Sequence, residues 1–283
     1  MVAMADQVRE SKLSWLIRRR VWVQSFFLLL WLDPFMLRLH SVCGPVFHCY
    51  SCPLAVVACP IGILANFSAL HLFPFLAVGT LLVVGSLLGT AICGWACPFG
   101  LLQDLIGRLP LPKLKLPTWA GYPRYAVLIA MVFVIPYLYG DDHPLFFCLL
   151  CPAGALEGAV PNAVKSAGTE AGLVLPSVQK IVVLGGILLA MFFTLRPWCT
   201  VFCPLGAIFS LFNKASILTL RFRREGCREC GACDKMCRYD VLPAVDVNNA
   251  ECIRCLECTR CRAIDVGTVF GKPSDRREAA EMT

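Results

Sequence analysis

The sequence predicts an α-helical membrane protein with about four transmembrane helices in two pseudo-symmetric halves, followed by a small cysteine-rich C-terminal domain. Three observations lead to this fold class. The 283 residues are 58% hydrophobic and only 16% charged, whereas soluble globular chains carry about 25% charged residues. Long apolar segments alternate with clusters of basic residues. The 18 cysteines recur at fixed spacings, in a repeated unit and in a dense C-terminal group.

Four apolar segments are the predicted membrane spans, because about 20 apolar residues cross the hydrocarbon core of a bilayer. They are residues 21–39, 70–93, 125–139 and 181–195. The second contains no Asp, Glu, Lys or Arg, whereas the first is interrupted by Asp33 and Arg38. The last two reach the length of a span when their uncharged flanks are included. Asp33 and Pro34 stand where a signal-peptide cleavage site would be expected, so the first segment is predicted to remain as an anchor.

Basic residues predict the orientation of these spans, since cytoplasmic loops carry an excess of Lys and Arg. They gather before the first span, between the second and third, and after the fourth: Arg18, Arg19, Arg20, Arg108, Lys113, Lys115, Arg124, Lys214, Arg221, Arg223 and Arg224. The loop at residues 40–70 has none, and the loop at 140–177 has only Lys165. Both chain ends are therefore predicted to be cytoplasmic, in a multi-pass protein of a bacterial or archaeal-type inner (cytoplasmic) membrane. The formal charge of +7 is attributed to this topology rather than to a nucleic-acid partner.

The C-terminal cysteines form two compact motifs. Cys227, Cys230, Cys233 and Cys237 have the spacing C-x2-C-x2-C-x3-C, and Cys252, Cys255, Cys258 and Cys261 have C-x2-C-x2-C-x2-C. Thiolates at every third residue can bind three corners of a cubane cluster, and in two-cluster ferredoxins the last cysteine of each motif serves the other cluster. The predicted sets are thus Cys227, Cys230, Cys233 with Cys261, and Cys252, Cys255, Cys258 with Cys237. Neither motif ends in the usual proline, which leaves the fourth ligands open. The alternative, a pair of zinc sites, usually takes separated cysteine pairs.

A shorter unit, C-P-x-G followed by two apolar residues, occurs four times in the apolar part of the chain. Its cysteines are Cys59, Cys97, Cys151 and Cys203. Proline directly after cysteine suits the first position of a helix, where its missing N–H costs nothing. The cysteine then lies at a helix N-terminus, whose partial positive charge stabilises a thiolate or an anionic cluster. Packing alone gives cysteine and glycine no reason to recur together.

Each unit has candidate cysteine partners upstream. Cys93 and Cys199 precede their units by four residues and Cys148 by three, and the candidates for the first unit are Cys43, Cys49 and Cys52. In the predicted topology, Cys93, Cys97, Cys199 and Cys203 form one set of four thiolates at the inner membrane face. The outer side holds Cys43, Cys49, Cys52, Cys59, Cys148 and Cys151. These six are predicted to ligate one cluster, with two cysteines left as a disulfide or as free thiols. The alternative is disulfides alone, which an oxidising compartment favours.

The chain therefore divides into two similar halves and a C-terminal module. Each half contains a span going out, an outer unit, a span returning and an inner unit, which predicts a pseudo-twofold axis along the membrane normal. The predicted domains are a cytoplasmic basic N-terminus (1–20), a transmembrane domain (21–220), a ferredoxin-like domain with two [4Fe-4S] clusters (221–271) and a polar tail (272–283). Stacked in this order, the cysteine sets predict a line of redox centres from the cytoplasm to the outer face.

Two other residues are candidates for chemistry. Asp33 lies within a predicted span and His71 on the outer side, and an ionisable residue inside a span is a functional candidate. A quinol-oxidising site needs proton acceptors, so Asp33 and His71 are candidates for quinone binding or proton transfer. The alternative is an outer surface that docks a partner, to which all the histidines belong: His40, His48, His71 and His143. The chain has no motif for covalent haem or nucleotide binding.

The C-x3-C-P pairs at Cys93/Cys97 and Cys199/Cys203, followed by a two-cluster module, resemble the NapH/NosR/YccM-type membrane-bound polyferredoxin family. The resemblance covers about residues 15–270. It implies electron transfer between quinol or cytoplasmic donors and periplasmic partners. This sequence differs from the NosR type in lacking the outer flavin-binding domain. Its additional outer cysteines favour a path that reaches the outer face through clusters alone.

The predicted function is that of an integral-membrane iron–sulfur electron-transfer subunit. It relays electrons between the cytoplasmic-side ferredoxin domain and an outer-face partner such as a cytochrome, through two C-terminal [4Fe-4S] clusters and one or two in the membrane domain. No catalytic residue is predicted; lipid and the catalytic subunit of a hetero-oligomeric oxidoreductase complex are the expected partners. Two alternatives stay open. One is a quinol dehydrogenase of a periplasmic reductase system, with its site near Asp33 and His71. The other is a metal-handling or assembly factor for a respiratory enzyme, whose membrane thiols bind copper.

Overall fold

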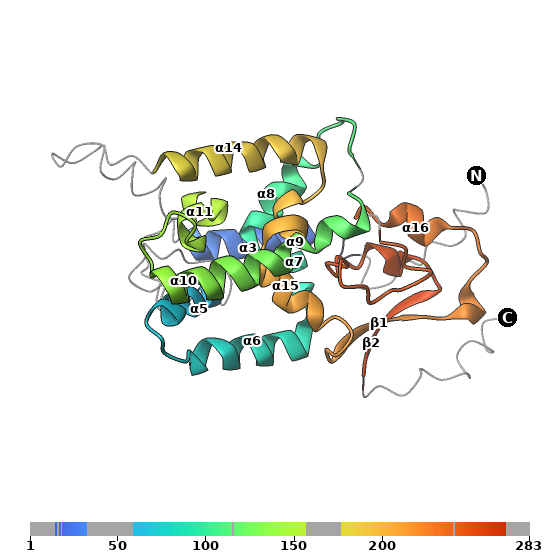
Figure 1. Cartoon of the computed structure of the whole chain (residues 1–283). Helices are drawn as coiled ribbons and strands as arrows, with labels where there is room; N and C mark the ends of the chain where they lie inside the picture. Colours follow the sequence, from blue (N-terminus) through green and yellow to red (C-terminus); the bar gives the residue numbers. More distant parts are fainter. Residues whose placement is uncertain are drawn as a thin grey trace.

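The computed structural model describes residues 15, 17, 19–32, 59–114, 116–156, 177–239 and 241–269 of the chain. The described part is mostly helical, with a two-stranded sheet near the C-terminus (Figure 1). Several residues singled out above lie outside it: Asp33, His40, Cys43, His48, Cys49 and Cys52. The polar tail (272–283) and most of the basic N-terminus (1–20) lie outside it as well.

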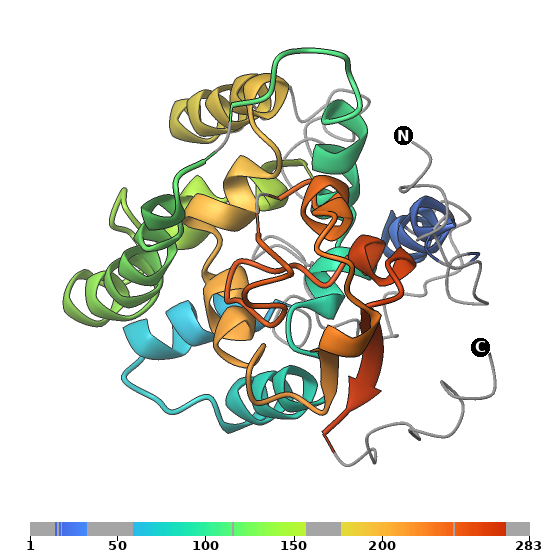
Figure 2. The same ribbon diagram turned by 90° about the vertical axis from the view of Figure 1, so that its right-hand side faces the viewer.

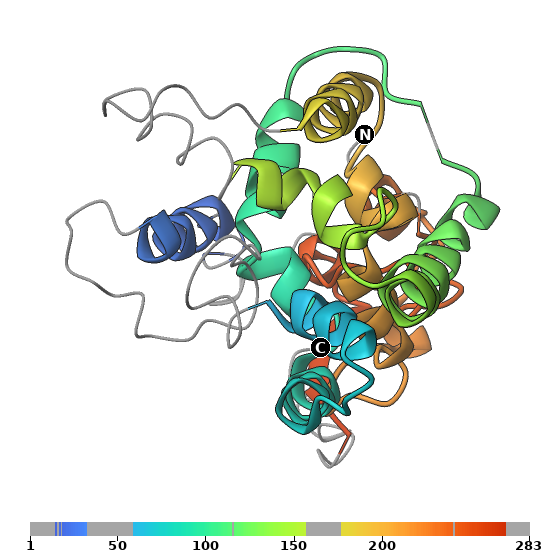
Figure 3. The same cartoon turned by 60° about the vertical axis from the view of Figure 1, so that its left-hand side comes forward.

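Apolar helices form the outside of the helical part. They are α3 (Arg20–Leu32), α6 (Phe75–Leu88), α14 (Val178–Phe193) and a continuous segment made of α9 (Pro123–Val127), the π-helix η3 (Leu128–Val134) and α10 (Ile135–Tyr139). In Figure 1 they run in roughly the same direction, with the C-terminal module at one end. Figures 2 and 3 agree that α14 and α6 lie on opposite sides, with α3 and α10 on the two sides between them. Corresponding helices of the two halves therefore face each other across the molecule.

Within the described residues, Trp119–Tyr139 alone is a helix long and apolar enough to cross a membrane, while α6 and α14 are apolar but shorter. The predicted span at residues 70–93 is not one helix, because α6 covers only its middle part. Gly89, with φ of +55°, turns the chain into the short helix α7 (Ala91–Trp95), and glycine adopts such a φ at no steric cost. A count of four transmembrane helices therefore stays a prediction.

Large apolar side chains cover the outward faces of these helices. Exposed examples are Phe75, Leu76, Leu82, Val83, Ile129, Leu138, Val178, Val182 and Leu189. Helix α6 buries only Ala77, Leu81 and Gly85, and Phe75 at its start is 78% exposed. Soluble monomers rarely expose contiguous apolar surface of this extent. The outside of the helical part therefore favours an apolar surrounding over water.

The C-P-x-G units form the inside of the helical part. Helices α5 (Pro60–Ala69), α8 (Pro98–Ile106), α12 (Pro152–Gly154) and α15 (Pro204–Leu211) each begin at the proline of one unit. Their first residues pack in one apolar core together with Val132, Phe146, Met191 and Phe209. The four units thus meet inside the molecule, although they are far apart in the sequence.

The C-terminal module is built on a small antiparallel sheet. Strand β1 (Leu218–Phe222) pairs with β2 (Ile264–Thr268), and between them lie the cysteine motifs with α16 (Ala232–Met236) and η7 (Glu257–Arg260). Leu220 and Ile264 form a small core with Cys233, Cys258 and Cys261. A two-stranded sheet is marginally stable on its own. The module therefore depends on its small core and on its contact with the helices.

The loop 252–254 fastens the module to α7. Thr90, just before α7, donates a hydrogen bond from Oγ1 to Cys252 O at 2.6 Å. Trp95, the last residue of α7, donates from Nε1 to Arg254 O at 3.0 Å. The two bonds hold the loop against α7 at both ends of that helix.

Asn213 and Arg254 strengthen the same contact from opposite sides. Asn213 is fully buried; its Nδ2 donates to Cys252 O at 2.8 Å and its Oδ1 accepts the Thr90 N–H at 3.2 Å. Arg254 is 1% exposed and reaches into the helical part, where Nη1 donates to Leu88 O at 3.0 Å. Because buried polar groups need partners, these bonds fix one orientation of the module on the helices.

The close approach of loop 252–254 to α7 requires a glycine at position 94. A Cβ there would lie 2.5 Å from Ile253 O, so Gly94→Ala is expected to displace the module, to lower the unfolding temperature and to speed proteolytic release of the C-terminal module in detergent. Gly79→Ala is the matched control, because a Cβ at Gly79 meets no atom within 4 Å and alanine is the better helix former. Equal proteolysis rates for the two variants would contradict this account of the contact.

Candidate functional site

Each C-P-x-G unit starts a helix as the sequence predicts. The cysteine is the N-cap residue, in extended backbone conformation, and the proline lies in the first turn. In three units the cysteine Sγ accepts the backbone N–H of the glycine three residues later: Cys59 from Gly62 at 3.4 Å, Cys97 from Gly100 at 3.3 Å and Cys203 from Gly206 at 3.5 Å. The predicted location at helix N-termini is confirmed. Each sulfur lies where the helix dipole favours negative charge.

The glycine of the inner units makes room for the partner cysteine. A Cβ at Gly100 would lie 3.1 Å from Cys93 O, and a Cβ at Gly206 would lie 3.0 Å from Cys199 O. Both distances are tighter than ordinary contacts of a Cβ with an oxygen. Glycine therefore lets the turn that carries the first cysteine pass close to the helix that carries the second, which explains the recurring C-x3-C-P-x-G spacing.

One cavity brings together the four cysteines predicted at the inner membrane face. It is lined by Cys93 and Cys97 from the first half and by Cys199 and Cys203 from the second. All four are buried or half-buried. The walls between them are largely apolar and include Phe99, Trp198 and Leu205. We call these four cysteines the inner set.

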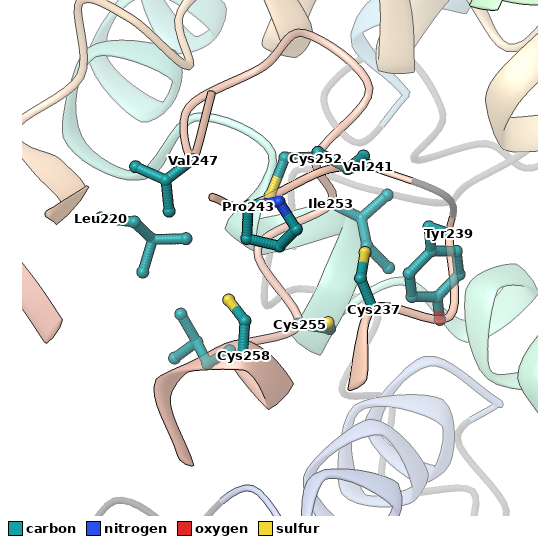
Figure 4. Close-up of a pocket in the computed structure, with 11 residues that line it drawn as sticks. Leu220, Cys237, Tyr239, Val241, Pro243, Val247, Cys252, Ile253, Cys255 and Cys258 are labelled. Atoms are coloured by element: carbon teal, nitrogen blue, oxygen red, sulfur yellow. The ribbon is translucent and has the colours of Figure 1, made fainter. Parts of the chain in front are cut away.

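A second cavity lies in the module (Figure 4). Its lining includes Cys237, Cys252, Cys255 and Cys258, and apolar residues such as Leu220 and Val247 close it. In Figure 4 the four cysteines approach the same space from different sides. They are the four residues predicted as one C-terminal set, and we call them the module set.

Burial makes three of the module-set thiols poor acids in the absence of metal. It raises the pKa of Cys252 to about 12, with Cys255 and Cys237 adding to the rise, and it raises the pKa of Cys255 and Cys258 above the ordinary value as well. Metal binding needs the thiolates. Three thiols that resist ionisation alone, in one cavity with Cys237, are thus suited to a group that supplies positive charge.

The donor chemistry of both cavities fits an iron–sulfur cluster. In a cubane each thiolate binds a different iron, so the sulfurs surround a common centre instead of one ion. Among the residues described by the structure, no three Cys, His, Asp or Glu side chains are arranged to hold a single metal ion. Soft sulfur ligands in an apolar surrounding favour iron–sulfur chemistry over hard cations.

The other predicted C-terminal set is only partly gathered. Cys233 and Cys261 are buried in the same small core, and Cys227 packs against it. Burial, with Asp234 and Cys261 nearby, raises the pKa of Cys233 to about 11. Cys230 is exposed at the surface of the module. This set therefore lies nearer to solvent than the module set.

Two polar side chains reach the inner set, Gln103 from helix α8 and Arg196 from the segment after α14. Gln103, 1% exposed, donates from Nε2 to Cys199 Sγ at 3.0 Å and accepts the Trp198 N–H at 3.3 Å. Arg196, also 1% exposed, donates from Nη1 to Cys93 O at 2.8 Å. Hydrogen bonds and positive charge at the ligating sulfurs are the means by which a protein raises the potential of such a cluster.

Asp104 connects its own helix α8 with three distant segments beside the inner set. Its carboxylate accepts hydrogen bonds from Arg196 Nε at 2.8 Å and Nη2 at 2.6 Å, from Arg20 at the start of α3, and from the Tyr239 hydroxyl of the module at 2.9 Å. Burial alone raises the pKa of a carboxyl, but Arg196 and Arg20 hold the pKa of Asp104 below its ordinary value. The carboxylate is therefore charged and pairs with two buried guanidinium groups, which leaves the three side chains with a net positive charge.

The outer cysteines are described only in part. The Sγ atoms of Cys59 and Cys148 flank Gly62, at 3.6 and 3.8 Å from the position of a Cβ there, and Cys151 begins α12. Cys43, Cys49 and Cys52 lie outside the described residues, as does Asp33. His71 is exposed in the turn between α5 and α6, with its ring 4.3 Å from that of Tyr137. The role of His71 and Asp33 in quinone binding or proton transfer thus stays a prediction.

Sequence reasoning did not single out the polar residues around the inner set. Gln103 and Asp104 follow a C-P-x-G unit in an otherwise apolar helix, and Arg196 lies three residues before Cys199 at the end of an apolar run. A charge in such a place requires a buried partner or a functional reason. That signal was present, but it does not say which residues pair.

A sequence family described as a 4Fe-4S binding domain matches two segments of the chain, residues 70–117 and 181–225. The first contains Cys93 and Cys97, and the second contains Cys199 and Cys203. The match thus falls on the segments that supply the inner set, once in each half.

Curated relatives extend the likeness. An uncharacterized protein of Methanocaldococcus jannaschii is 30% identical over 69% of this chain and 79% of its own length. The putative electron transport protein YccM of Escherichia coli is 26% identical over 76% of this chain and 61% of its own length. The regulatory protein NosR of Pseudomonas aeruginosa is 30% identical over 59% of this chain and 22% of its own length. The chain belongs to the NapH/NosR/YccM-type ferredoxin family.

Membership of the NapH/NosR/YccM-type family confirms the resemblance inferred from the cysteine motifs. The electron-transport relatives and the 4Fe-4S domain support an iron–sulfur electron-transfer role for the chain. The chain spans less than two thirds of YccM and of NosR, so their complete activities and partners are not assigned to it. No solved structure matches the chain.

Asp104→Asn is expected to destabilise the protein strongly. Removing one partner of a buried ion pair leaves an uncompensated charge and costs about 3–5 kcal/mol, and here both Arg20 and Arg196 lose their carboxylate. The thermal unfolding midpoint in detergent measures the loss. Asp246→Asn is the control, because the pair between Lys214 and Asp246 spans 3.7 Å at the surface and surface pairs contribute about 0–1 kcal/mol. A similar midpoint for both variants would exclude a stabilising role for the Asp104 network.

Proposed function

We propose that the chain is an integral-membrane iron–sulfur subunit that relays electrons between its cytoplasmic-side module and a partner at the outer face of the membrane. The family and its 4Fe-4S domain support the electron-transfer role itself. The direction of electron transfer across a membrane, the number of clusters and the ligands of each cluster are parts of the proposal.

The adjacency of the two cysteine-lined cavities carries this proposal. The cavity of the inner set and the cavity of the module set share two lining residues, Cys252 and Ile253. Cys252 belongs to the module set and at the same time borders the cavity of the inner set. Because electron tunnelling weakens steeply with distance, two adjoining sites support a path from the module into the helical part.

Three sets of cysteines have defined places in this path. Cys227, Cys230, Cys233 and Cys261 hold the cluster nearest to solvent, the module set holds the next, and the inner set holds the third. A bound [4Fe-4S] cluster supplies a one-electron carrier. The chain supplies thiolates, N–H donors such as Gln103 and walls such as Trp198 that keep water away. The exposure of Cys230 supports entry or exit of electrons at the module surface.

The outer cysteines extend the path beyond the inner set. Cys151 and Cys203 pack against the same apolar core, and the sulfurs of Cys59 and Cys148 flank the same glycine. Together with Cys43, Cys49 and Cys52 they are proposed to form a set at the outer face, with a disulfide or free thiols for those left over. This set would deliver electrons to the outer partner without a flavin.

Membrane insertion in two pseudo-symmetric halves is supported by sequence and contacts together. The 4Fe-4S domain matches each half once. Thr90 precedes Cys93 by three residues and bonds to Asn213 of the second half, while Arg196 precedes Cys199 by three and bonds to Asp104 of the first. The outward apolar faces and the basic segments between them support four spans with both chain ends in the cytoplasm.

A redox protein is the expected partner. Relatives carry printed names such as electron transport protein, regulatory protein NosR and methylamine utilization ferredoxin-type protein. We propose that a cytochrome or the catalytic subunit of an oxidoreductase receives the electrons in a hetero-oligomeric complex.

Iron and acid-labile sulfide per purified chain, combined with EPR of the reduced protein, test the proposal. The complete path with four cubane clusters predicts about sixteen irons per chain. About eight, with signals of the ferredoxin pair alone, would overturn it and favour a quinol dehydrogenase or a metal-handling protein. A change of the spectra with a quinone analogue would distinguish these two.

Serine substitutions separate the inner set from the module. Cys97→Ser and Cys203→Ser are each expected to lose one membrane cluster and its EPR signal while the C-terminal pair is retained, because a hydroxyl is a poor ligand for the cluster iron. Cys255→Ser is the matched variant and is expected to lose a C-terminal cluster while the membrane signal persists. Unchanged iron content in both Cys97→Ser and Cys203→Ser would count decisively against the inner set.

A further inference from the structure

Arg124 is a buried cation at the cavity of the inner set. It lies in α9, at the module end of the helix Trp119–Tyr139, and its side chain is 5% exposed. It lines the same cavity as Cys93, Cys97, Cys199 and Cys203. The sequence analysis counted Arg124 only as one of the basic residues that orient the spans.

The guanidinium of Arg124 is incompletely hydrogen-bonded. Its Nη2 donates to the Tyr125 hydroxyl at 3.3 Å and to Ala250 O at 3.4 Å, both long, and its Nε has no partner among the described residues. A buried N–H without an acceptor costs about 1–3 kcal/mol, and more when the group is charged. Such a donor at the wall of a cavity indicates an acceptor inside that cavity.

Arg124 forms no ion pair with a carboxylate in the described part. Glu251 lines the same cavity and interacts with the charge of Arg124, yet no ion pair joins the two side chains, whereas Arg196 is paired with Asp104. Four thiolates around a [4Fe-4S] core carry a net negative charge in both redox states, larger after reduction. Of the two arginines, Arg196 uses its Nε–H on Asp104, so Arg124 is the one whose Nε–H is available to the inner set.

We propose that Arg124 acts on the group held at the inner set. Its Nε–H donates to a sulfur of that group, and its charge raises the reduction potential of that group. The inference rests on the proposed function, since it requires a cluster at the inner set. On reduction, the group at the inner set gains one electron without an accompanying proton. The guanidinium of Arg124 stabilises the added negative charge. Arg124 thereby favours electron transfer onto the inner set from its neighbours.

Redox titration of the purified holoprotein, monitored by EPR, tests this inference. Arg124→Gln keeps a polar side chain but removes the charge, and it is expected to lower the equilibrium constant for one-electron reduction of the membrane cluster at least about tenfold, or 59 mV. Arg124→Lys keeps the charge, and the reduction potential of its membrane cluster is expected to lie between those of Arg124→Gln and wild type. Potentials of the C-terminal clusters are expected to stay unchanged. Arg108→Gln, an exposed position beyond α8, is the matched control and is expected to leave all potentials unchanged.

Each outcome distinguishes an effect of the Arg124 charge from an effect of the packing of its side chain. An unchanged membrane potential in Arg124→Gln with full iron content would overturn the inference and leave the proposed function intact. An equal shift of every cluster would overturn it too, because the effect would not be local. If Arg124→Gln loses the membrane iron, retention in Arg124→Lys supports the charge, and loss in both variants refutes it. Wild-type protein without a membrane cluster would overturn both the inference and the proposed function.

Discussion

The contact of loop 252–254 with helix α7 is the constraint on which the other features depend. Cys252 is bound through its carbonyl by Thr90 and Asn213, so a residue of the module set is held against the turn that carries Cys93. Gly94 permits the approach, because no side chain fits between α7 and Ile253 O. Without this contact the two cysteine-lined cavities would be separate sites in two loosely connected domains. With it, they adjoin.

Buried charge follows from that arrangement. Thiolates buried away from water need compensating cations, and buried cations in turn need anionic or hydrogen-bonding partners. Asp104 is the anionic partner of Arg20 and Arg196, whereas Arg124 lines the cavity without an ion pair. Backbone N–H groups at the starts of α8 and α15 add donors that bring no charge of their own. The inside of the helical part thus combines an apolar core with a few buried charged and hydrogen-bonding groups.

Sequence reasoning was most successful where the physics is local. Proline after cysteine determines a helix start by itself, so the helix starts of all four units could be predicted. The ferredoxin pattern grouped Cys237 with Cys252, Cys255 and Cys258, which line one cavity, although it left the fourth ligand open. It was wrong about residues 70–93 as one helix, because composition does not register the turn at Gly89. The partners of Asp104 could not be predicted, since they come from α3, from the second half and from the module. Long-range pairing needs the fold.

The reciprocal bonds between the halves bear on how the protein is made. Chains emerge from the ribosome N-terminal half first, so Cys93, Cys97 and Asp104 are synthesised well before Arg196, Cys199 and Cys203. Until then the first half has two thiols of a four-thiol site and a carboxylate without one of its guanidinium partners. The contact with Cys252 comes later still. The cavity of the inner set can therefore be completed only after the second half has been synthesised, and a chain truncated before residue 199 would hold Cys93 and Cys97 without their partner cysteines.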